Sequence, residues 1–142
     1  MISVDKTINK CRASGMRITA QRVEILKLLE GNRTHPTAEE IFRDVKKSQP
    51  AISRATVYNT INILVELDEL RELVYTSGPR RFDPDLTPHD HAVCIKCGGF
   101  FDVKSDNDVR SSIFIDEKPF KVKSRDTTYH GLCQVCANSN DS

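Results

Sequence analysis

The chain has 142 residues, 38% of them hydrophobic, which is enough to bury the core of one ordinary domain or of two small ones and excludes a disordered protein. No apolar segment approaches the ~20 residues needed to cross a bilayer, and the N-terminus has no apolar signal segment, so we expect a cytoplasmic protein. The formal net charge of +1 is unevenly divided, since residues 1–83 carry 14 Lys and Arg against 11 Asp and Glu, and residues 84–142 carry 7 against 9. This balance permits nucleic-acid binding by the first part of the chain without requiring it.

Helical spacing of apolar residues predicts four helices in the first half of the chain. Three of them follow a residue suited to cap a helix, namely Thr19, Thr37 and Ser53, and Thr37 can form a capping box with Glu40. The short gap between the last two helices is typical of a helix-turn-helix motif. The expected helices cover residues 4–11, 20–30, 38–49 and 54–70.

A two-stranded hairpin is predicted directly after the fourth helix. Ser77-Gly78-Pro79 is a turn signal between two short strand-like segments, 72–76 and 80–83. A hairpin at this point in the chain is the wing of a winged helix, and Pro84 and Pro88 then indicate a linker. The predicted division is a winged-helix DNA-binding domain at 1–83, a hinge at 84–88 and a second domain at 89–142.

The second domain is expected to contain strands. Two strand-like segments, 91–96 and 100–104, flank Gly98-Gly99, which favours a turn between them. A weaker pattern suggests a helix at about 106–117, and residues 120–132 are expected to return as one strand. Helices followed by a region of strands predict an α+β protein.

Two Cys-x-x-Cys pairs, 35 residues apart, lie in this second domain. Four thiolates in two short loops can close a tetrahedron around one Zn²⁺ ion, so we predict a structural zinc site. A thiol-disulfide exchange site is the main alternative, but one pair is enough for redox chemistry and neither pair opens a helix in a βαβ unit. The fifth cysteine, Cys11, is expected to be an apolar helix residue. The predicted zinc ligands are Cys94, Cys97, Cys133 and Cys136.

A second metal site is predicted from histidines and acids. His89 and His91 alternate along an extended segment, so both imidazoles should face the same side. Asp102 lies across the Gly98-Gly99 turn and should face them from the paired strand, and Asp83 precedes the hinge. Imidazole and carboxylate donors suit Fe(II), Mn(II) or Zn(II), in contrast to the four thiolates.

The first turns of the fourth predicted helix carry polar and small side chains that could read the major groove of DNA. Arg80 and Arg81 in the predicted wing are expected to touch phosphate or the minor groove. Because several acids crowd into residues 66–72, we expect these arginines and Arg54 to be weakly neutralised. The candidate DNA-contacting residues are Arg54, Ala55, Thr56, Tyr58, Asn59, Arg80 and Arg81.

Six segments spread over almost the whole chain carry a family resemblance. They are HPTAEEIF at 35–42, SRATVYNTINILVEL at 53–67, RRFD at 80–83, HDHAVCIKCG at 89–98, FDV at 101–103 and GLCQVC at 131–136. Together they resemble the ferric uptake regulator (Fur) family of bacterial metal-responsive repressors, and the acid choice at Asp83 and Asp102 is similar to its peroxide-sensing PerR branch.

The resemblance implies an N-terminal winged helix, a hinge and a C-terminal α/β dimerisation domain, with a homodimer bound to a palindromic operator on double-stranded DNA. It also implies that His35 joins the regulatory Fe(II) or Mn(II) site. By position, the regulatory ligands would be His35, Asp83, His89, His91 and Asp102. Peroxide would act through oxidation of a ligand histidine, His35 or His89, and the targets would be oxidative-stress and iron genes.

Three alternatives remain open on the sequence. The same site could sense Fe(II) concentration in an iron-uptake repressor. His89, His91 and Asp102 could form the facial triad of a small non-haem iron enzyme, although the chain has no obvious substrate-enclosing domain and we expect no enzyme. A zinc-stabilised protein-interaction module is the third.

Overall fold

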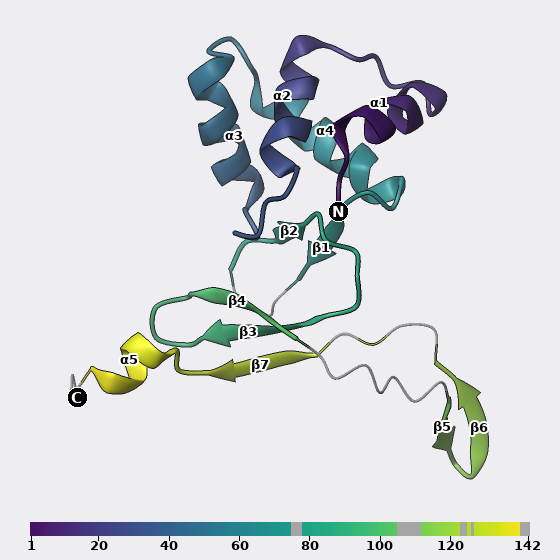
Figure 1. Ribbon diagram of the computed structural model, residues 1–142, viewed down its shortest axis with the longest axis vertical. Helices are drawn as coiled ribbons and strands as arrows, with labels where there is room; N and C mark the ends of the chain where they lie inside the picture. Colours follow the sequence, from purple (N-terminus) through teal and green to yellow (C-terminus); the bar gives the residue numbers. More distant parts are fainter. Residues whose placement is uncertain (75–77, 105–111, 123–124, 126, 140–142) are drawn as a thin grey trace. The chain divides into compact units, whose positions relative to one another are not determined.

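The computed structural model describes residues 1–74, 78–104, 112–122, 125 and 127–139. It divides into two compact units, residues 1–87 and 88–142. Helices occur mainly in the first unit and strands mainly in the second, which confirms the α+β class (Figure 1). Every helix in the described part of the chain is too short or too polar to span a lipid bilayer.

Four helices form most of the first unit, at the top of Figure 1, and the predicted caps explain where they begin. The Thr19 side chain accepts a hydrogen bond from the backbone N–H of Arg22, and Ser53 does the same for Thr56. Thr37 and Glu40 form the complete capping box. The helices are α1 (Val4–Ala13), α2 (Ala20–Leu29), α3 (Ala38–Ser48) and α4 (Arg54–Glu66).

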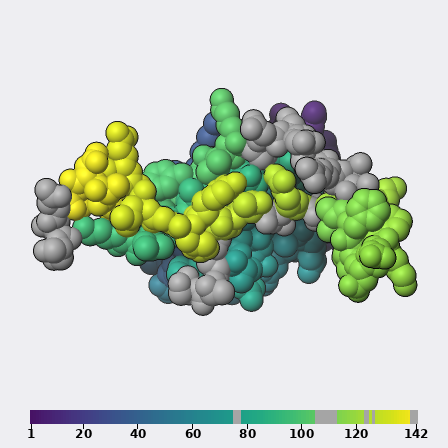
Figure 2. All heavy atoms as spheres, turned by 90° about the horizontal axis from the view of Figure 1, so that it is seen from below, coloured from purple at the N-terminus to yellow at the C-terminus, as the bar shows by residue number. Residues whose placement is uncertain are grey.

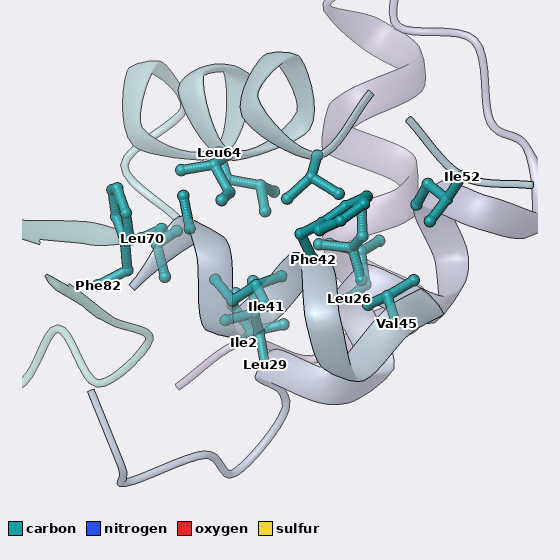
Figure 3. Close-up of a cluster of buried hydrophobic side chains, with 14 of the residues drawn as sticks. Ile2, Leu26, Leu29, Ile41, Phe42, Val45, Ile52, Leu64, Leu70 and Phe82 are labelled. Atoms are coloured by element: carbon teal, nitrogen blue, oxygen red, sulfur yellow. The ribbon is translucent and has the colours of Figure 1, made fainter. Parts of the chain in front are cut away.

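A single apolar core holds these helices together. Leu26 and Leu29 of α2 pack with Ile41 of α3 and Leu64 of α4, and each of the four is fully buried (Figure 3). Burying one such side chain contributes about 1.5–3 kcal/mol, so this cluster makes a large favourable contribution to the stability of the unit. Cys11 is buried in the same core, as expected. All members of the cluster belong to the first unit.

The wing is a short antiparallel hairpin that also pairs with the backbone just before α3. Strand β1 (Arg71–Leu73) pairs with β2 (Arg81–Asp83), so that Glu72 lies opposite Phe82. The predicted turn residue Ser77 lies outside the described residues. The backbone N–H of Phe82 donates to the carbonyl of Pro36 at 3.0 Å, and Thr37 forms a β-bridge with Arg81. The wing is therefore tied to the segment that leads into α3.

The second unit is built on a three-stranded sheet. Its central strand β3 (Asp90–Cys94) is antiparallel to β4 (Phe100–Val103) and parallel to β7 (Thr128–Gly131). A short helix α5 (Gln134–Asn138) follows β7 (Figure 1). Gly98, in the left-handed conformation at φ 72, forms the predicted turn between β3 and β4.

Two predictions for this unit are wrong. Residues 112–117 are not helical, because β5 (Ser112–Ile115) pairs with β6 (Lys118–Lys121) across a tight turn. Apolar β-branched and aromatic residues in β5, together with left-handed Asp116 and Glu117, explain this hairpin. The remainder of the predicted helix, 106–111, lies outside the described residues. Nor is there one strand over 120–132, since β6 ends at Lys121 and pairs with β5, whereas β7 begins at Thr128 and pairs with β3.

Candidate metal centres

The four cysteines of the two Cys-x-x-Cys pairs meet in the second unit. Cys94 ends β3 and Cys97 lies in the turn that follows, while Cys133 caps α5 and Cys136 lies within that helix. The second pair thus opens a short helix, whereas the first is in a turn. Parallel pairing of β3 with β7 aligns Cys94 with Gly131, which brings the end of β7 and the start of α5 to the first pair.

The spacing of the sulfur atoms fits a tetrahedral metal ion. All four Sγ atoms lie within 4.8 Å of one another, and those of Cys97 and Cys133 are 3.9 Å apart. A Zn²⁺ ion with four bonds of about 2.3 Å holds its sulfurs about 3.8 Å apart. All four cysteines have free thiols, so no disulfide competes for them.

Backbone groups around the cluster favour thiolates. The N–H of Gly99 donates to Cys97 Sγ at 3.4 Å, and that of Cys136 donates to Cys133 Sγ at 3.5 Å. Backbone N–H groups, first that of Cys133 and then that of Cys97, lower the pKa of Cys94 to about 6. The pKa of Cys136 is raised to about 12, first by its hydrogen bond with the Cys133 side chain. Four clustered thiols cannot all ionise unless a cation offsets their mutual repulsion.

A second cluster of donors in the same unit has a different chemistry. His89 and His91 lie on one side of the β3 segment, with ring centroids 4.5 Å apart. Asp102 on β4 is directly opposite His91 in the strand register, as predicted. Its Oδ1 atom lies 3.3 Å from Nε2 of His89 and 3.6 Å from Nε2 of His91. Two imidazoles and one carboxylate thus converge, with their ligand atoms within 4.8 Å of one another.

The first unit carries the other two predicted donors. Nε2 of His35 lies 3.3 Å from Oδ2 of Asp83, and both side chains are about 1% exposed. The second carboxylate oxygen of Asp83 accepts the backbone N–H of Asp85 at 2.9 Å. Carboxylates that bind metal ions are commonly oriented by such a hydrogen bond, so this buried pair is suited to metal ligation.

His35 has a strained backbone that the fold holds in place. Its φ is 52°, although it is not glycine and precedes Pro36, which disfavours helical conformations. The guanidinium of Arg81 donates to the His35 carbonyl at 3.0 Å. Strain of this kind persists only where surrounding contacts determine the conformation, and it is concentrated at functional sites. The sequence indicated Arg81 only as a wing residue, and its link to His35 depends on pairing between segments that are 46 residues apart.

The candidate DNA-contacting residues lie on one end of α4 and on the wing. Ala55, Tyr58 and Asn59 are exposed, and Thr56 is half-buried. The expectation that the three arginines are weakly neutralised is wrong, because acids from other elements reach them. Arg54 pairs with Glu39, Arg80 with Glu72, and Arg81 lies 3.6 Å from Glu40.

Four helices with a β-hairpin, followed by a unit with a cysteine cluster and a histidine–aspartate cluster, define a winged-helix protein with two candidate metal centres. The model of the ferric uptake regulator family matches residues 13–130, and the chain belongs to this family.

The known proteins that it resembles agree with this assignment. The chain is 34% identical to the peroxide-responsive repressor PerR of Staphylococcus saprophyticus over 94% of its own length and 90% of that protein. Among solved structures, the chain matches the ferric uptake regulator Fur of Helicobacter pylori with a TM-score of 0.78 at 21% identity, over 98% of this chain and 97% of that one. The structure of that protein is described as revealing three functional metal-binding sites. The Campylobacter jejuni peroxide stress regulator matches with a TM-score of 0.66 at 25% identity, covering 94% and 99%.

Proposed function

We propose that this protein is a metal-dependent transcriptional repressor that binds operator DNA as a homodimer and releases it when peroxide oxidises a ligand histidine. The observation that carries the proposal is the donor set. His35 and Asp83 belong to the first unit, whereas His89, His91 and Asp102 belong to the second. A metal ion that needs donors from both sets would restrict the angle between the units.

The chain connection makes a shared ion feasible. Asp83 and His89 are six positions apart, so their Cα atoms are separated by at most about 22 Å. The linker is itself ordered by side-chain turns, since Asp85 Oδ1 accepts hydrogen bonds from the N–H and hydroxyl of Thr87. Three imidazoles and two carboxylates suit Fe(II) or Mn(II), and the four cysteines suit a structural Zn²⁺ ion.

DNA binding is supported by the first unit. α3 and α4 form a helix-turn-helix in which the exposed start of α4 carries Arg54, Ala55, Tyr58 and Asn59. Arginine can pair with guanine, asparagine with adenine, and a small side chain can pack on the thymine methyl group. With the regulatory metal bound, the angle between the units would match the two half-sites of a palindromic operator.

Dimerisation is supported by exposed apolar side chains on the β5–β6 hairpin of the second unit, which is light green in Figure 2. Ile113, Phe114 and Ile115 of β5 and Phe120 of β6 are 43–74% exposed in the single chain. An isolated two-stranded hairpin is marginally stable in water, so it needs a further surface to pack against. A second copy of the chain would supply that surface and, at the same time, a second recognition helix.

The peroxide response is attributed to the imidazoles. His35 and His89 are among the residues that would hold Fe(II), which would supply the redox chemistry that opens the O–O bond of hydrogen peroxide and would be regenerated. Overall, peroxide would oxidise one imidazole ring of His35 or His89 by two electrons: one peroxide oxygen is inserted into a ring C–H bond, and the other leaves as water. The oxidised ring is a poor ligand, so the contact between the two donor sets is lost and the protein releases DNA. The relatives named as peroxide-responsive repressors support this proposal over a sensor of iron concentration.

Operator binding with Fe(II) or Mn(II), before and after peroxide, tests the proposal. We expect both metals to promote binding, and peroxide to abolish binding only with Fe(II), with one added oxygen atom on a peptide that contains His35 or His89. Oxidation confined to the cysteines would instead show a thiol sensor. Binding that follows Fe(II) concentration and is insensitive to peroxide would show an iron sensor.

A further inference from the structure

Two arginines that face the proposed DNA surface are held by carboxylates of the same chain. Nε of Arg54 lies 2.8 Å from Oε1 of Glu39, and Nη1 of Arg80 lies 2.8 Å from Oε1 of Glu72. Glu39 is in α3 whereas Arg54 begins α4, and Glu72 is in β1 whereas Arg80 directly precedes β2. The tertiary structure therefore creates both pairs.

The Arg54 side chain is folded back onto α3. Its guanidinium carbon lies 4.5 Å from the centroid of the Phe42 ring, and its Nη2 atom is 3.5 Å from the second carboxylate oxygen of Glu39. The hydrogen bond with Glu39 raises the pKa of Arg54, and the guanidinium is charged at neutral pH, so the two side chains form an ion pair. To reach DNA, it must leave both the carboxylate and the ring.

Both acids line one cavity of about 310 Å³ between α4 and the wing. Arg80 and Tyr58 line it as well, so the two carboxylates lie beside side chains that are assigned to DNA. A DNA phosphate that approaches this surface meets two carboxylates, which are negatively charged as it is. These carboxylates already form ion pairs with the arginines that the phosphate would bind.

Arg81 differs from these two arginines. Its side chain is 26% exposed, compared with 63% for Arg54 and 67% for Arg80, and it donates to the His35 carbonyl. Its carboxylate neighbour, Glu40, is already engaged in capping α3. Arg81 therefore has a structural role at the junction of the wing and α3. The ion pairs that DNA could replace are those of Arg54 and Arg80.

We propose that Glu39 and Glu72 are intramolecular competitors of DNA, which occupy Arg54 and Arg80 in the free protein and are exchanged for phosphate in non-specific complexes, and in the case of Arg54 for a guanine edge in the operator. This inference rests on the proposed DNA-binding function. This exchange reduces the binding free energy that each arginine–phosphate contact contributes, because every new ion pair with DNA replaces an ion pair within the protein. Non-specific DNA offers only phosphate contacts, so the competition weakens non-specific binding most in relative terms.

The test measures the affinity of the full-length, Mn(II)-loaded protein for a duplex without an operator and for operator DNA. We expect Glu39→Gln and Glu72→Gln each to tighten non-specific binding about two- to fivefold, the range expected for loss of one exposed ion pair. The matched control is Glu66→Gln, which makes the same charge change at an exposed position in the last turn of α4. An equal effect of all three variants, or weaker binding by Glu39→Gln, would overturn the inference.

A double-mutant cycle separates direct competition from a general change of charge. Glu39→Gln should tighten binding in the normal protein and have no effect in an Arg54→Ala background. An unchanged effect in that background would overturn the inference while leaving DNA binding intact. If the unsubstituted protein binds no DNA but Glu39→Gln and Glu72→Gln do, competition is supported in its strongest form. If none of them binds, both the inference and the proposed function fail.

Discussion

The cysteine cluster and the histidine–aspartate donors differ in how the chain distributes them. All four cysteines belong to residues 88–142, and their sulfur atoms converge within that unit. The other set is divided, with two donors in residues 1–87 and three in residues 88–142. A metal bound within one unit stabilises that unit, whereas a metal that requires donors from both units would also restrict how they are joined, and could report a signal in this way. The same chain therefore separates a structural site from a candidate switch.

The two units also differ in what stabilises them. The apolar core lies entirely in the first unit, and among the described residues of the second, Cys94 is the one buried hydrophobic side chain. A unit with so little buried apolar surface needs another source of stability, such as metal ligation or a partner subunit.

The largest expected effect is that of Cys97→Ser. Structural zinc contributes about 10–16 kcal/mol in small zinc-dependent peptides, so loss of one thiolate should unfold the second unit and abolish dimerisation. Zinc analysis, circular dichroism and sedimentation would show this. Cys11→Ala is the matched control, because it removes a thiol from the core of the first unit and should retain one zinc ion per chain. A folded, dimeric, zinc-free Cys97→Ser protein would contradict the structural role.

Asp102→Asn should disable the second centre without affecting the first. The substitution keeps the size of the side chain but removes the charge that faces both His89 and His91. Loss of a group that merely hydrogen-bonds to a metal ligand lowers metal affinity by about tenfold or more, so the affinity for Mn(II) should fall by at least that factor. Metal-dependent DNA binding should also be lost. Calorimetric titration would measure the affinity. Asp116→Asn, in the β5–β6 turn, should change neither property, and retained DNA binding by Asp102→Asn would exclude Asp102 as a regulatory ligand.

A smaller effect is expected from a methyl group placed next to the cysteine cluster. In Gly99→Ala, the new Cβ would lie 3.2 Å from Cys97 Sγ and 3.0 Å from Cζ of Phe101. We expect zinc affinity to fall by about tenfold because the ligand must shift. Competition with a chelator would measure it. Gly131→Ala is the control, since its Cβ would meet nothing within 4 Å. Equal zinc affinities of the two variants would show that the turn tolerates the displacement.

The smallest effect concerns the stability of the first unit. Glu69 accepts hydrogen bonds from Thr7 at 2.7 Å and from Lys10, and these bonds connect α1 to the turn that follows α4. Burial raises the pKa of Glu69, but the bonds from Lys10 and Thr7 outweigh burial, and the net pKa is lowered. We expect Glu69→Gln to cost about 1 kcal/mol of unfolding free energy at neutral pH.

The pH dependence gives this prediction a sign. Because the folded-state pKa of Glu69 lies below the unfolded value of about 4.5, its contribution is complete above that pH and is lost as the pH falls through the folded-state pKa. Urea unfolding of the two proteins should therefore differ at pH 7 and converge in acid. A constant difference across this range would mean that the charge of Glu69 is irrelevant.

The sequence alone predicted the four helices of the first unit and a cluster of the two cysteine pairs, but not α5, because the predicted features depend on local signals. Thr37 and Glu40 are three residues apart, and each Cys-x-x-Cys pair is contained in one turn, so nearest-neighbour chemistry determines them. The pairing of His91 with Asp102 was also predictable, since only a glycine turn separates the two strands. The helix expected over 106–117 was wrong where the structure describes it, because strand pairing of β5 with β6 overrides a weak helical period.

What the tertiary structure decided is which charged groups meet. Arg54 and Glu39 are 15 residues apart, and Arg81 and the His35 carbonyl are 46 residues apart. The charge pattern of the sequence predicted that Arg54, Arg80 and Arg81 are weakly neutralised, whereas the tertiary structure provides each of these three with an acid or a carbonyl. Local sequence specifies the donors and caps, because their partners are a few bonds away. The pairing of charged groups that are distant in the sequence depends on how the whole core packs, so it cannot be predicted from a local sequence pattern.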